Sequence, residues 1–134
     1  MAAIEEVEGI GPAYAEKLRA AGVATTDALL ELGASSKGRE ELATKAGVSA
    51  KLILEWVNHV DLFRVKGVGS EYADLLEAAG VDTVPELAQR NAANLVAKMA
   101  EVNAAKSLVR QVPSEKSVAG WIEHAKTLPS VVTH

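Results

Sequence analysis

Apolar residues recur along the chain at spacings of three and four, which place side chains on one face of an α-helix. The clearest stripe lies between residues 49 and 63 and consists of Leu52, Ile53, Trp56, Val57 and Val60. No segment shows the run of alternating β-branched residues that is typical of a strand. The pattern therefore predicts an all-α fold made of short helices.

In the first half of the chain, residues that start and stop helices delimit four of them. Pro12 follows Gly11 and favours a helix that ends at Gly22. The other three are expected at about 26–32, ending at Gly33; from Ser36, as a cap, to Gly47; and from Ser49, as a cap, to about Phe63.

The second half repeats this plan. Ser70 is expected to cap a helix that ends at Gly80, and Thr83 with Glu86 resembles a capping box that opens the next helix. The remaining expected features are two short helices capped by Asn91 and Asn103, a last helix at about 115–127, and a frayed tail at 130–134.

The chain contains an internal repeat. Residues 7–23 align without gaps with residues 65–81, and ten of the seventeen pairs are identical. Farther on, Trp56 and His59 match Trp121 and His124, and the offset between the copies grows from 58 to 65. We interpret the chain as a duplication with copies at 1–64 and 65–129, which together form one pseudo-symmetric globule.

Composition excludes several classes of site. The 134 residues are 49% hydrophobic but only 4% aromatic, so the core must come from Ala, Leu and Val. Because there is no cysteine, disulfides, thiolate metal sites and thiol nucleophiles are excluded. No metal-ligand spacing, nucleophile elbow or P-loop is present, and we expect no enzyme and no metal site. The start of the chain does not resemble a signal peptide, no apolar run could span a membrane, and a cytoplasmic location is expected.

The charge balance does not favour a dedicated nucleic-acid domain, which usually has a basic footprint. The net charge is −4, with ten acidic and seven basic residues in 1–64 against eight and seven in 65–134. A site for a polyanion is therefore expected in the second half.

Both copies contain an apolar-x-Gly-apolar-Gly segment that leads straight into a helix, at residues 7–11 and 65–69. Glycine permits positive φ and a close approach of the backbone to a partner. The amides of the first helical turn lack partners within the helix and lie at the positive end of its dipole, so such a turn can hold a phosphate oxygen. Ile10 and Val68 are expected to turn inward and pin the turns. The alternative is a tight turn that only packs two helices.

These turns, with the tyrosine three residues later and the Ala-Ala-Gly-Val ending, resemble helix-hairpin-helix motifs. Such hairpins, often paired, grip the sugar-phosphate backbone of DNA without reading the bases. From about Ile4 to Pro129 the chain is similar to a family of small bacterial helix-hairpin-helix proteins of unknown function, with hallmarks at 9–15, 54–58, 67–72 and 81–88. The superfamily also implies a monovalent cation held by hairpin carbonyls; no other cofactor is expected.

Two departures weaken the DNA interpretation, and they weaken it unequally. Hairpins that grip DNA commonly carry Lys or Arg two residues after the second glycine, where this chain has Ala13 and Glu71. Acidic residues Glu5, Glu6 and Glu8 precede the first turn, whereas basic residues Arg64 and Lys66 precede the second. If either turn meets phosphate, it should be the second.

Four other features have a structural interpretation that we weigh against a functional one. The Trp-x-x-His pairs are expected to lie in the core or in a seam between the copies rather than to bind a ligand, and Tyr14 and Tyr72 to pack on the hairpins. Residues 46–49 resemble a degenerate hairpin with a packing role. The basic residues of the second half are read either as a solvated face or as a polyanion patch: Arg90, Lys98, Lys106 and Arg110.

The sequence thus favours a small non-catalytic binding or adaptor protein that makes weak, sequence-nonspecific contact with the backbone of DNA or RNA. The alternative is a protein-protein scaffold with no nucleic-acid role. Neither involves a membrane. The expected phosphate-binding residues are Lys66, Gly67, Val68, Gly69 and Ser70, with Gly9, Ile10 and Gly11 as a weaker counterpart.

Overall fold

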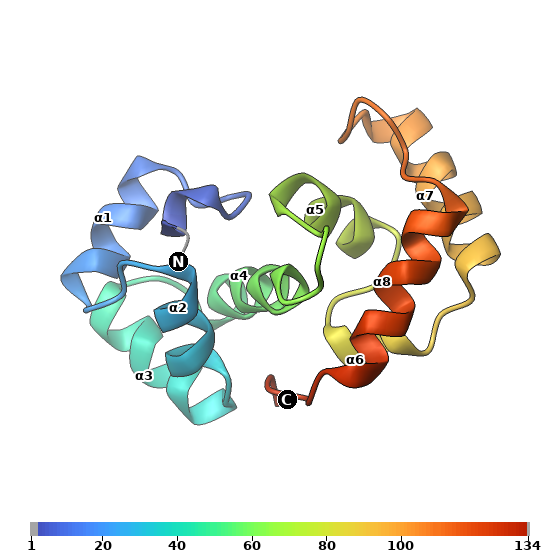
Figure 1. Ribbon diagram of the computed structural model, residues 1–134. Coiled ribbons are helices and arrows are strands. Elements are labelled where there is room, and N and C mark those ends of the chain that lie inside the picture. Colours follow the sequence, from blue (N-terminus) through green and yellow to red (C-terminus); the bar gives the residue numbers. More distant parts are fainter. Residues whose placement is uncertain (1–2, 134) are drawn as a thin grey trace. The chain divides into compact units, whose positions relative to one another are not determined.

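The computed structural model describes residues 3–133, and all the regular elements there are helices (Figure 1). This confirms the all-α prediction. The elements are η1 (Ile4–Glu6), α1 (Pro12–Ala20), α2 (Thr26–Gly33), α3 (Ser36–Ala46), α4 (Ala50–Phe63), α5 (Ser70–Ala78), α6 (Val84–Ala88), α7 (Ala92–Lys106) and α8 (Glu115–Thr127).

The chain divides into two compact units. Unit 1 comprises Met1–Asp61 and Val131–His134, and unit 2 comprises Leu62–Ser130. The division falls in the last turn of α4, three residues before the boundary that the repeat predicts.

Short polar side chains start most of the helices, because a side-chain oxygen can accept a hydrogen bond from a first-turn amide. Ser49 accepts one from the Leu52 amide at 3.1 Å, as the sequence predicts. The cap of α3 is Ser35 rather than Ser36, and it accepts from the Gly38 amide at 3.0 Å. Further caps are Thr25, Asn91 and Ser114.

Two expected caps behave differently. The N-cap of α5 is Gly69, which has no side-chain cap, and Ser70 is the first helical residue. At α6 the N-cap is Thr83, as expected, but its hydroxyl donates to Glu86 Oε1 at 3.5 Å instead of capping an amide. Glu86 reaches back to the amide of Asp82 at 3.4 Å, one residue earlier than a capping box requires.

Equivalent glycines end the first helix of each copy. Gly22 and Gly80 have φ of +92° and +95°, a left-handed conformation that glycine adopts without strain. The following amides, of Val23 and Val81, return to the carbonyls of Leu18 and Leu76, each at 2.8 Å. Both ends therefore have the hydrogen bond typical of a Schellman motif.

The break between two helices that the sequence predicts at Asn103 is absent. Asn103 does not cap a new helix; it lies inside α7, which continues to Lys106 and ends at Ser107 with φ of +52°. The Asn103 side chain instead holds the following loop, because Nδ2 donates to the Val109 carbonyl at 3.0 Å and Oδ1 accepts from the Val109 amide at 2.9 Å.

The additional residues of the second copy lie in α7 and in this loop. Helix α7 has 15 residues where α3 has 11. Three residues, 47–49, separate α3 from α4, whereas eight residues, 107–114, separate α7 from α8. The offset is 56 at the starts of α3 and α7 and 65 at the starts of α4 and α8, so the four extra helical residues and the five extra loop residues account for this growth.

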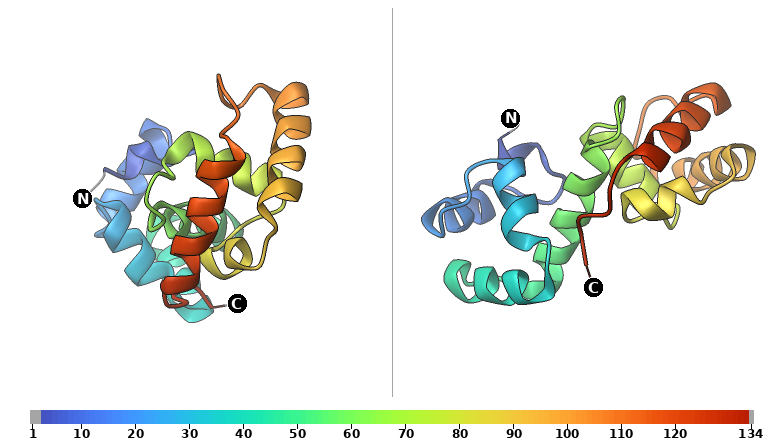
Figure 2. Two further views of the ribbon diagram at one scale, coloured as in Figure 1. Left: turned by 45° about the vertical axis from the view of Figure 1, so that its right-hand side comes forward. Right: turned by 60° about the horizontal axis from the view of Figure 1, so that its bottom comes forward.

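Each unit has its own apolar core. In unit 1, α1 contacts η1 and α3, and α2 contacts α3; in unit 2, α8 packs on α6 and α7, and α5 on α7. Figure 2 shows α7 and α8 side by side in both views. The core of unit 1 includes Ile4, Val7, Leu18, Val23, Leu29, Ile53 and Val57, and that of unit 2 includes Leu62, Leu75, Leu76, Val81, Leu87, Leu95, Met99 and Val118.

The C-terminal residues differ from the expected frayed tail. Val132 is buried, and the Thr133 amide donates to the Ala34 carbonyl at 2.7 Å. The guanidinium of buried Arg39 donates to the carbonyls of Gly33, Ala34 and Thr133 at 2.9, 3.1 and 2.7 Å. Arg39 thus ties residues 131–133 to the corner between α2 and α3, and burial lowers its pKa. His134 lies outside the described residues.

Candidate functional site

The two glycine turns have almost the same backbone. We call residues 7–11 the first hairpin and residues 65–69 the second hairpin. Their first glycines, Gly9 and Gly67, have φ of +92° and +94°, so each requires glycine. The residues between the glycines, Ile10 and Val68, are buried, as the sequence predicts. Each donates its amide to a carbonyl three residues back, at 3.1 and 3.0 Å, which closes the turn.

A tryptophan lies beneath the first glycine of each hairpin. A Cβ on Gly9 would lie 3.4 Å from Trp56 Nε1, and one on Gly67 would lie 3.0 Å from Trp121 Nε1. Tyr14 packs on Trp56 at 5.1 Å between ring centroids, and Tyr72 packs on Trp121 at 5.2 Å. Each turn therefore rests on an aromatic pair.

Sequence reasoning expected these aromatic residues to pack but did not find the partner of each tryptophan. The contact joins residues about 50 apart in the sequence, so no local pattern reveals it. The available signal was the repeat itself, because glycine, tyrosine and tryptophan occur together in both copies.

The second glycines, Gly11 and Gly69, are the N-caps of α1 and α5, and neither helix has a side-chain cap there. All four hairpin glycines are exposed. The first helical residue differs between the copies: Pro12 has no amide N–H, whereas Ser70 has one. The second hairpin therefore leads into a helix that offers one more backbone donor than the first.

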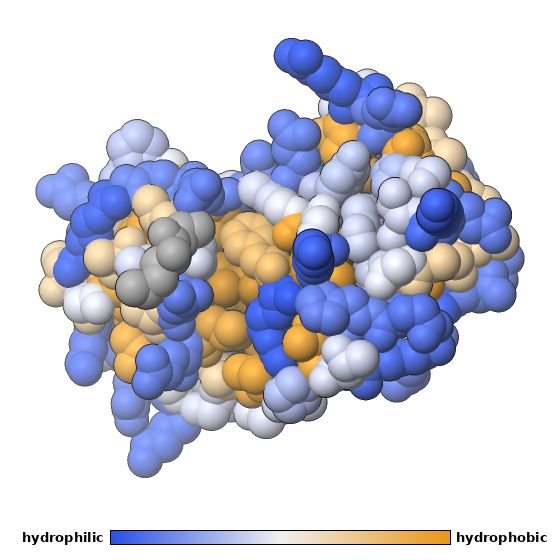
Figure 3. Space-filling view, viewed as in Figure 1, coloured by the Kyte–Doolittle hydropathy of each residue, from blue (hydrophilic) through white to orange (hydrophobic). Residues whose placement is uncertain are grey.

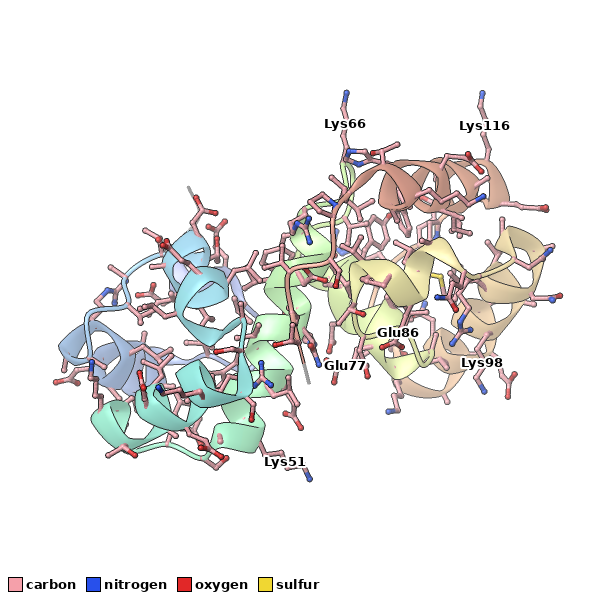
Figure 4. The ribbon with its side chains drawn as sticks, turned by 90° about the horizontal axis from the view of Figure 1, so that it is seen from below. Lys51, Lys66, Glu77, Glu86, Lys98 and Lys116 are labelled. Carbon is pink, nitrogen blue, oxygen red and sulfur yellow. The ribbon has the colours of Figure 1, made fainter. Side chains whose placement is uncertain are left out.

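A hollow of about 540 Å³ adjoins the second hairpin. We call it the α8 groove; its lining residues are Lys66, Gly67, Lys116, Ser117, Gly120, Trp121 and His124. Along α8 the lining residues recur at a spacing of four, at 116, 120 and 124 and at 117 and 121, which places them on one helix face. Lys66 and Lys116 project from the same side of unit 2 (Figure 4).

Two positions show that the first copy has different chemistry at the equivalent place. With the offsets of 58 and 65, Lys66 corresponds to Glu8, and Gly120 corresponds to Glu55. Both glutamates are exposed. The second copy therefore has a cation at the turn and a hollow on the helix, where the first copy has two carboxylates.

A histidine of α8 makes a hydrogen bond with the main chain of the second hairpin. The Lys66 amide donates to His124 Nδ1 at 3.0 Å. Because Nδ1 accepts this bond, the proton of the neutral ring lies on Nε2. His124 thus fixes the main chain at Lys66 and leaves the lysine side chain to extend into solvent.

A second hollow, of about 380 Å³, shares Gly67, Ser117 and Trp121 with the α8 groove. We call it the loop hollow, and its other lining residues are Tyr72, Gln111, Val112, Pro113 and Ser114. The segment 111–114 belongs to the longer loop of the second copy. None of these described lining residues carries a charge.

The structure brings only some of the expected site residues together. Lys66 and Gly67 border the α8 groove, and Gly69 starts α5 beside them, but Val68 is buried as the pin of the turn. The Ser70 hydroxyl is buried and makes no hydrogen bond among the described residues. The weaker counterpart, Gly9, Ile10 and Gly11, lies in unit 1. Lys116 and Gly120 were not anticipated.

Two of the other basic residues of unit 2 donate hydrogen bonds to main-chain carbonyls. Arg90 donates to the Gly80 carbonyl at 3.0 Å, and Arg64 donates to the Pro129 carbonyl at 2.6 Å. These two guanidinium groups therefore bind the segments that follow α5 and α8, whereas Lys98, Lys106 and Arg110 are exposed.

Two further classes of site can be assessed for residues 3–133. Within this part of the chain, no three His, Asp or Glu side chains come together as they would around a metal ion. None of the helices described has the length and apolarity needed to cross a membrane.

Comparison with known proteins adds one result. Residues 8–128 match the model of a family described as Domain of unknown function (DUF4332). The chain belongs to this family. The match covers both hairpins except Val7, together with α8, so the duplication and the groove lie within the DUF4332 domain. No curated protein and no solved structure gave a significant match.

Proposed function

We propose that this DUF4332 chain is a non-catalytic binding protein whose second hairpin and α8 groove contact the phosphate groups of nucleic acid without reading the bases. We further propose that its copies are helix-hairpin-helix units of the bacterial type, as the turns suggest. The nucleic acid of a bacterial cell lies in the cytoplasm, so the proposal implies a cytoplasmic location.

The pair of lysines at the groove supports this proposal most. Lys66 and Lys116 extend from the same side of unit 2, and the hollow between the hairpin and α8 lies against both (Figure 4). Lysine ammonium groups attract phosphate oxygens, and the amides at the start of α5 add donors beside them. No base-reading element is needed for contacts of this kind.

Nearby carboxylates limit the strength of this interaction. Glu71, Glu115 and Glu123 are exposed on α5 and α8. Like charge repels phosphate over a Debye length of about 10 Å at moderate salt. We therefore expect weak binding that depends steeply on salt concentration.

The alternative proposal is a protein-protein scaffold, which usually presents a contiguous apolar patch. Among the described residues, Leu32 is the one large hydrophobic residue that is exposed, at 48%. In the view of Figure 3, the surface over α8 is mainly polar, whereas apolar residues gather over α4. The surface at α8 therefore fits phosphate contact better than an apolar scaffold interface.

A salt titration of binding to a generic labelled duplex tests the proposal. Fluorescence anisotropy should give an affinity that falls linearly in a log-log plot, with a slope near −0.9 for each phosphate neutralised. Lys66→Glu and Lys116→Glu should each weaken binding about tenfold and reduce the slope by about one.

Lys51→Glu is the matched control, because Lys51 is the counterpart of Lys116 in the first copy and the net charge changes equally. It should leave the affinity within about twofold of the unaltered chain, since the first copy has no cationic hairpin. Equal losses for all three variants, or no binding at low salt, would contradict the proposal.

A further inference from the structure

The α8 groove and the loop hollow meet at Gly67, Ser117 and Trp121. They differ in chemistry. The α8 groove has ammonium groups from Lys66 and Lys116, whereas the loop hollow has neutral hydrogen-bonding groups from Gln111, Ser114 and Tyr72. A ligand that fits both must therefore be anionic at one end and neutral and polar at the other.

The wall of the loop hollow is a fixed structure. The two hydrogen bonds between Asn103 and Val109 hold the start of the loop, and Val109 and Pro113 are buried. At the other end, the Ser114 hydroxyl accepts from the Ser117 amide at 3.1 Å and starts α8. A wall anchored at both ends can present Gln111 to a ligand without a large loss of entropy on binding.

Gly120 leaves the middle of the α8 groove open. It is exposed, and a Cβ placed on it would meet no atom within 4 Å. Glycine inside a helix costs about 1 kcal/mol relative to alanine, so its presence in the middle of α8 is not explained by helix stability. The first copy has Glu55 at this position.

We infer that the α8 groove and the loop hollow form one site for a nucleoside phosphomonoester. The phosphate lies in the α8 groove, which both Lys66 and Lys116 line, and the nucleoside lies against the wall of Gln111 and Ser114. This inference rests on the proposed function and deepens it. The hollows are of the size usual for small-ligand sites, roughly 300–1,000 Å³.

The charge of the phosphate favours a monoester over the continuous backbone. A phosphomonoester carries about −1.5 to −2 charges at neutral pH, whereas each backbone diester carries one. Two lysines that line one hollow supply a charge closer to that of the monoester. The same chemistry occurs at the phosphorylated end of a strand and in a free mononucleotide.

The experiment compares labelled single strands that are identical except at their ends. Strands with a 5′-phosphate, a 3′-phosphate or hydroxyls at both ends are titrated into the full chain, with closed circular DNA as a separate ligand. We expect at least one phosphorylated strand to bind about tenfold more tightly than the hydroxyl strand.

Two substitutions that add the same charge locate the effect. Gly120→Glu should remove the preference, because it fills the groove and adds a carboxylate, and glutamate favours the helix so that folding is retained. Ala104→Glu, an exposed position of α7 that lines neither hollow, is the control and should retain the preference. Thermal unfolding checks that both variants are folded.

Competition with AMP and with inorganic phosphate separates the sources. If AMP displaces the labelled strand as effectively as an unlabelled phosphorylated strand does, the result supports a free nucleotide as the ligand. If AMP displaces it less effectively, the result supports the end of a strand as the ligand. Inorganic phosphate that competes as well as AMP would overturn the nucleoside part of the site.

Failure of this inference is distinguishable from failure of the proposed function. Equal affinity for phosphorylated and hydroxyl strands, with salt-dependent binding of circular DNA retained, would overturn the monoester site alone. Absence of binding to every ligand would overturn both.

Discussion

The two hairpins share a scaffold and differ in their chemistry. Their first glycines differ by 2° in φ, each rests on a tryptophan, and each tryptophan contacts a tyrosine. The exposed positions around them are different: Glu8 is replaced by Lys66, and Glu55 by Gly120. After a duplication, the residues that hold a turn in place are constrained by packing, whereas the solvent-facing residues are free to acquire a new charge. Because these exposed residues differ, we propose that the second hairpin is the one that binds.

The largest expected effect tests whether the scaffold is the same in both copies. Trp56→Ala and Trp121→Ala should each lower the free energy of unfolding by about 3–5 kcal/mol, because both side chains are buried and each supports a hairpin. Urea denaturation followed by circular dichroism measures the change. A cost below about 1 kcal/mol for either variant would show that its hairpin does not depend on the tryptophan.

A second comparison concerns the positions of Arg39 and Leu95, which correspond at the offset of 56 given by caps Ser35 and Asn91. Leu95 is part of an apolar core, whereas the Arg39 guanidinium donates a hydrogen bond to the Thr133 carbonyl. Arg39→Leu should cost about 2–3 kcal/mol, since three carbonyls lose a charged donor.

The same variant should release the C-terminal residues. Hydrogen exchange at the Thr133 amide, which bonds to the Ala34 carbonyl, should become faster in Arg39→Leu. Lys37→Leu, an exposed substitution on the same helix, is the control and should leave this exchange unchanged. Unaltered protection of Thr133 in Arg39→Leu would refute the tie between Arg39 and the chain end.

A third, smaller effect separates the two glycines of one hairpin. Gly67→Ala should cost about 1–2 kcal/mol, because alanine is strained at positive φ and its Cβ would press on Trp121. Gly69→Ala should stay within about 0.5 kcal/mol, because its φ is −100° and its surroundings are open. Gly9→Ala should cost slightly less than Gly67→Ala, since the contact with Trp56 is longer. Equal stabilities of the Gly67 and Gly69 variants in urea would show that the turn tolerates a side chain.

The smallest effect concerns an ion pair found in the first copy. Arg19 Nη2 lies 2.6 Å from Glu5 Oε1, and this hydrogen bond lowers the pKa of Glu5. The equivalent positions of the second copy are Phe63 and Glu77. A lowered pKa means that the pair stabilises the fold above the ordinary carboxyl pKa and that this stabilisation is lost as the pH falls through the lowered value.

Because both side chains are largely exposed, the contribution should be small. Glu5→Gln should lower Tm slightly at about pH 7, and this difference should shrink as the pH falls through the lowered pKa of Glu5. A Tm difference that persists in acid would show that the substitution acts through something other than charge.

Local signals in the sequence were sufficient for most of the helices. The periodic stripe of α4, the glycines at 22 and 80 and the cap at Ser49 act over a few residues, and the structure agrees with each. Asn103 was misplaced because an asparagine suits both a cap and a side-chain clamp, and only the tertiary position of Val109 distinguishes them. Arg39 was not singled out, because its acceptors are main-chain carbonyls, which have no sequence signature.

For the candidate site, the sequence located the turn but not the groove. Lys66 and Gly67 could be predicted because the hairpin is a contiguous sequence motif. Lys116 and Gly120 come from a helix about 50 residues later, and a glycine within a helix carries no indication of what lies opposite. Alignment of α8 on α4 at the offset of 65 would have shown that Gly120 replaces Glu55.

The claim that the two hairpins differ in binding is tested most directly by recording amide resonances of the ¹⁵N-labelled chain during titration with a generic duplex at low salt. The account predicts shifts in residues 66–72 and 116–124, while the equivalent residues 8–14 and 51–59 stay within error. Equal shifts in both sets, or shifts confined to the first copy, would contradict it.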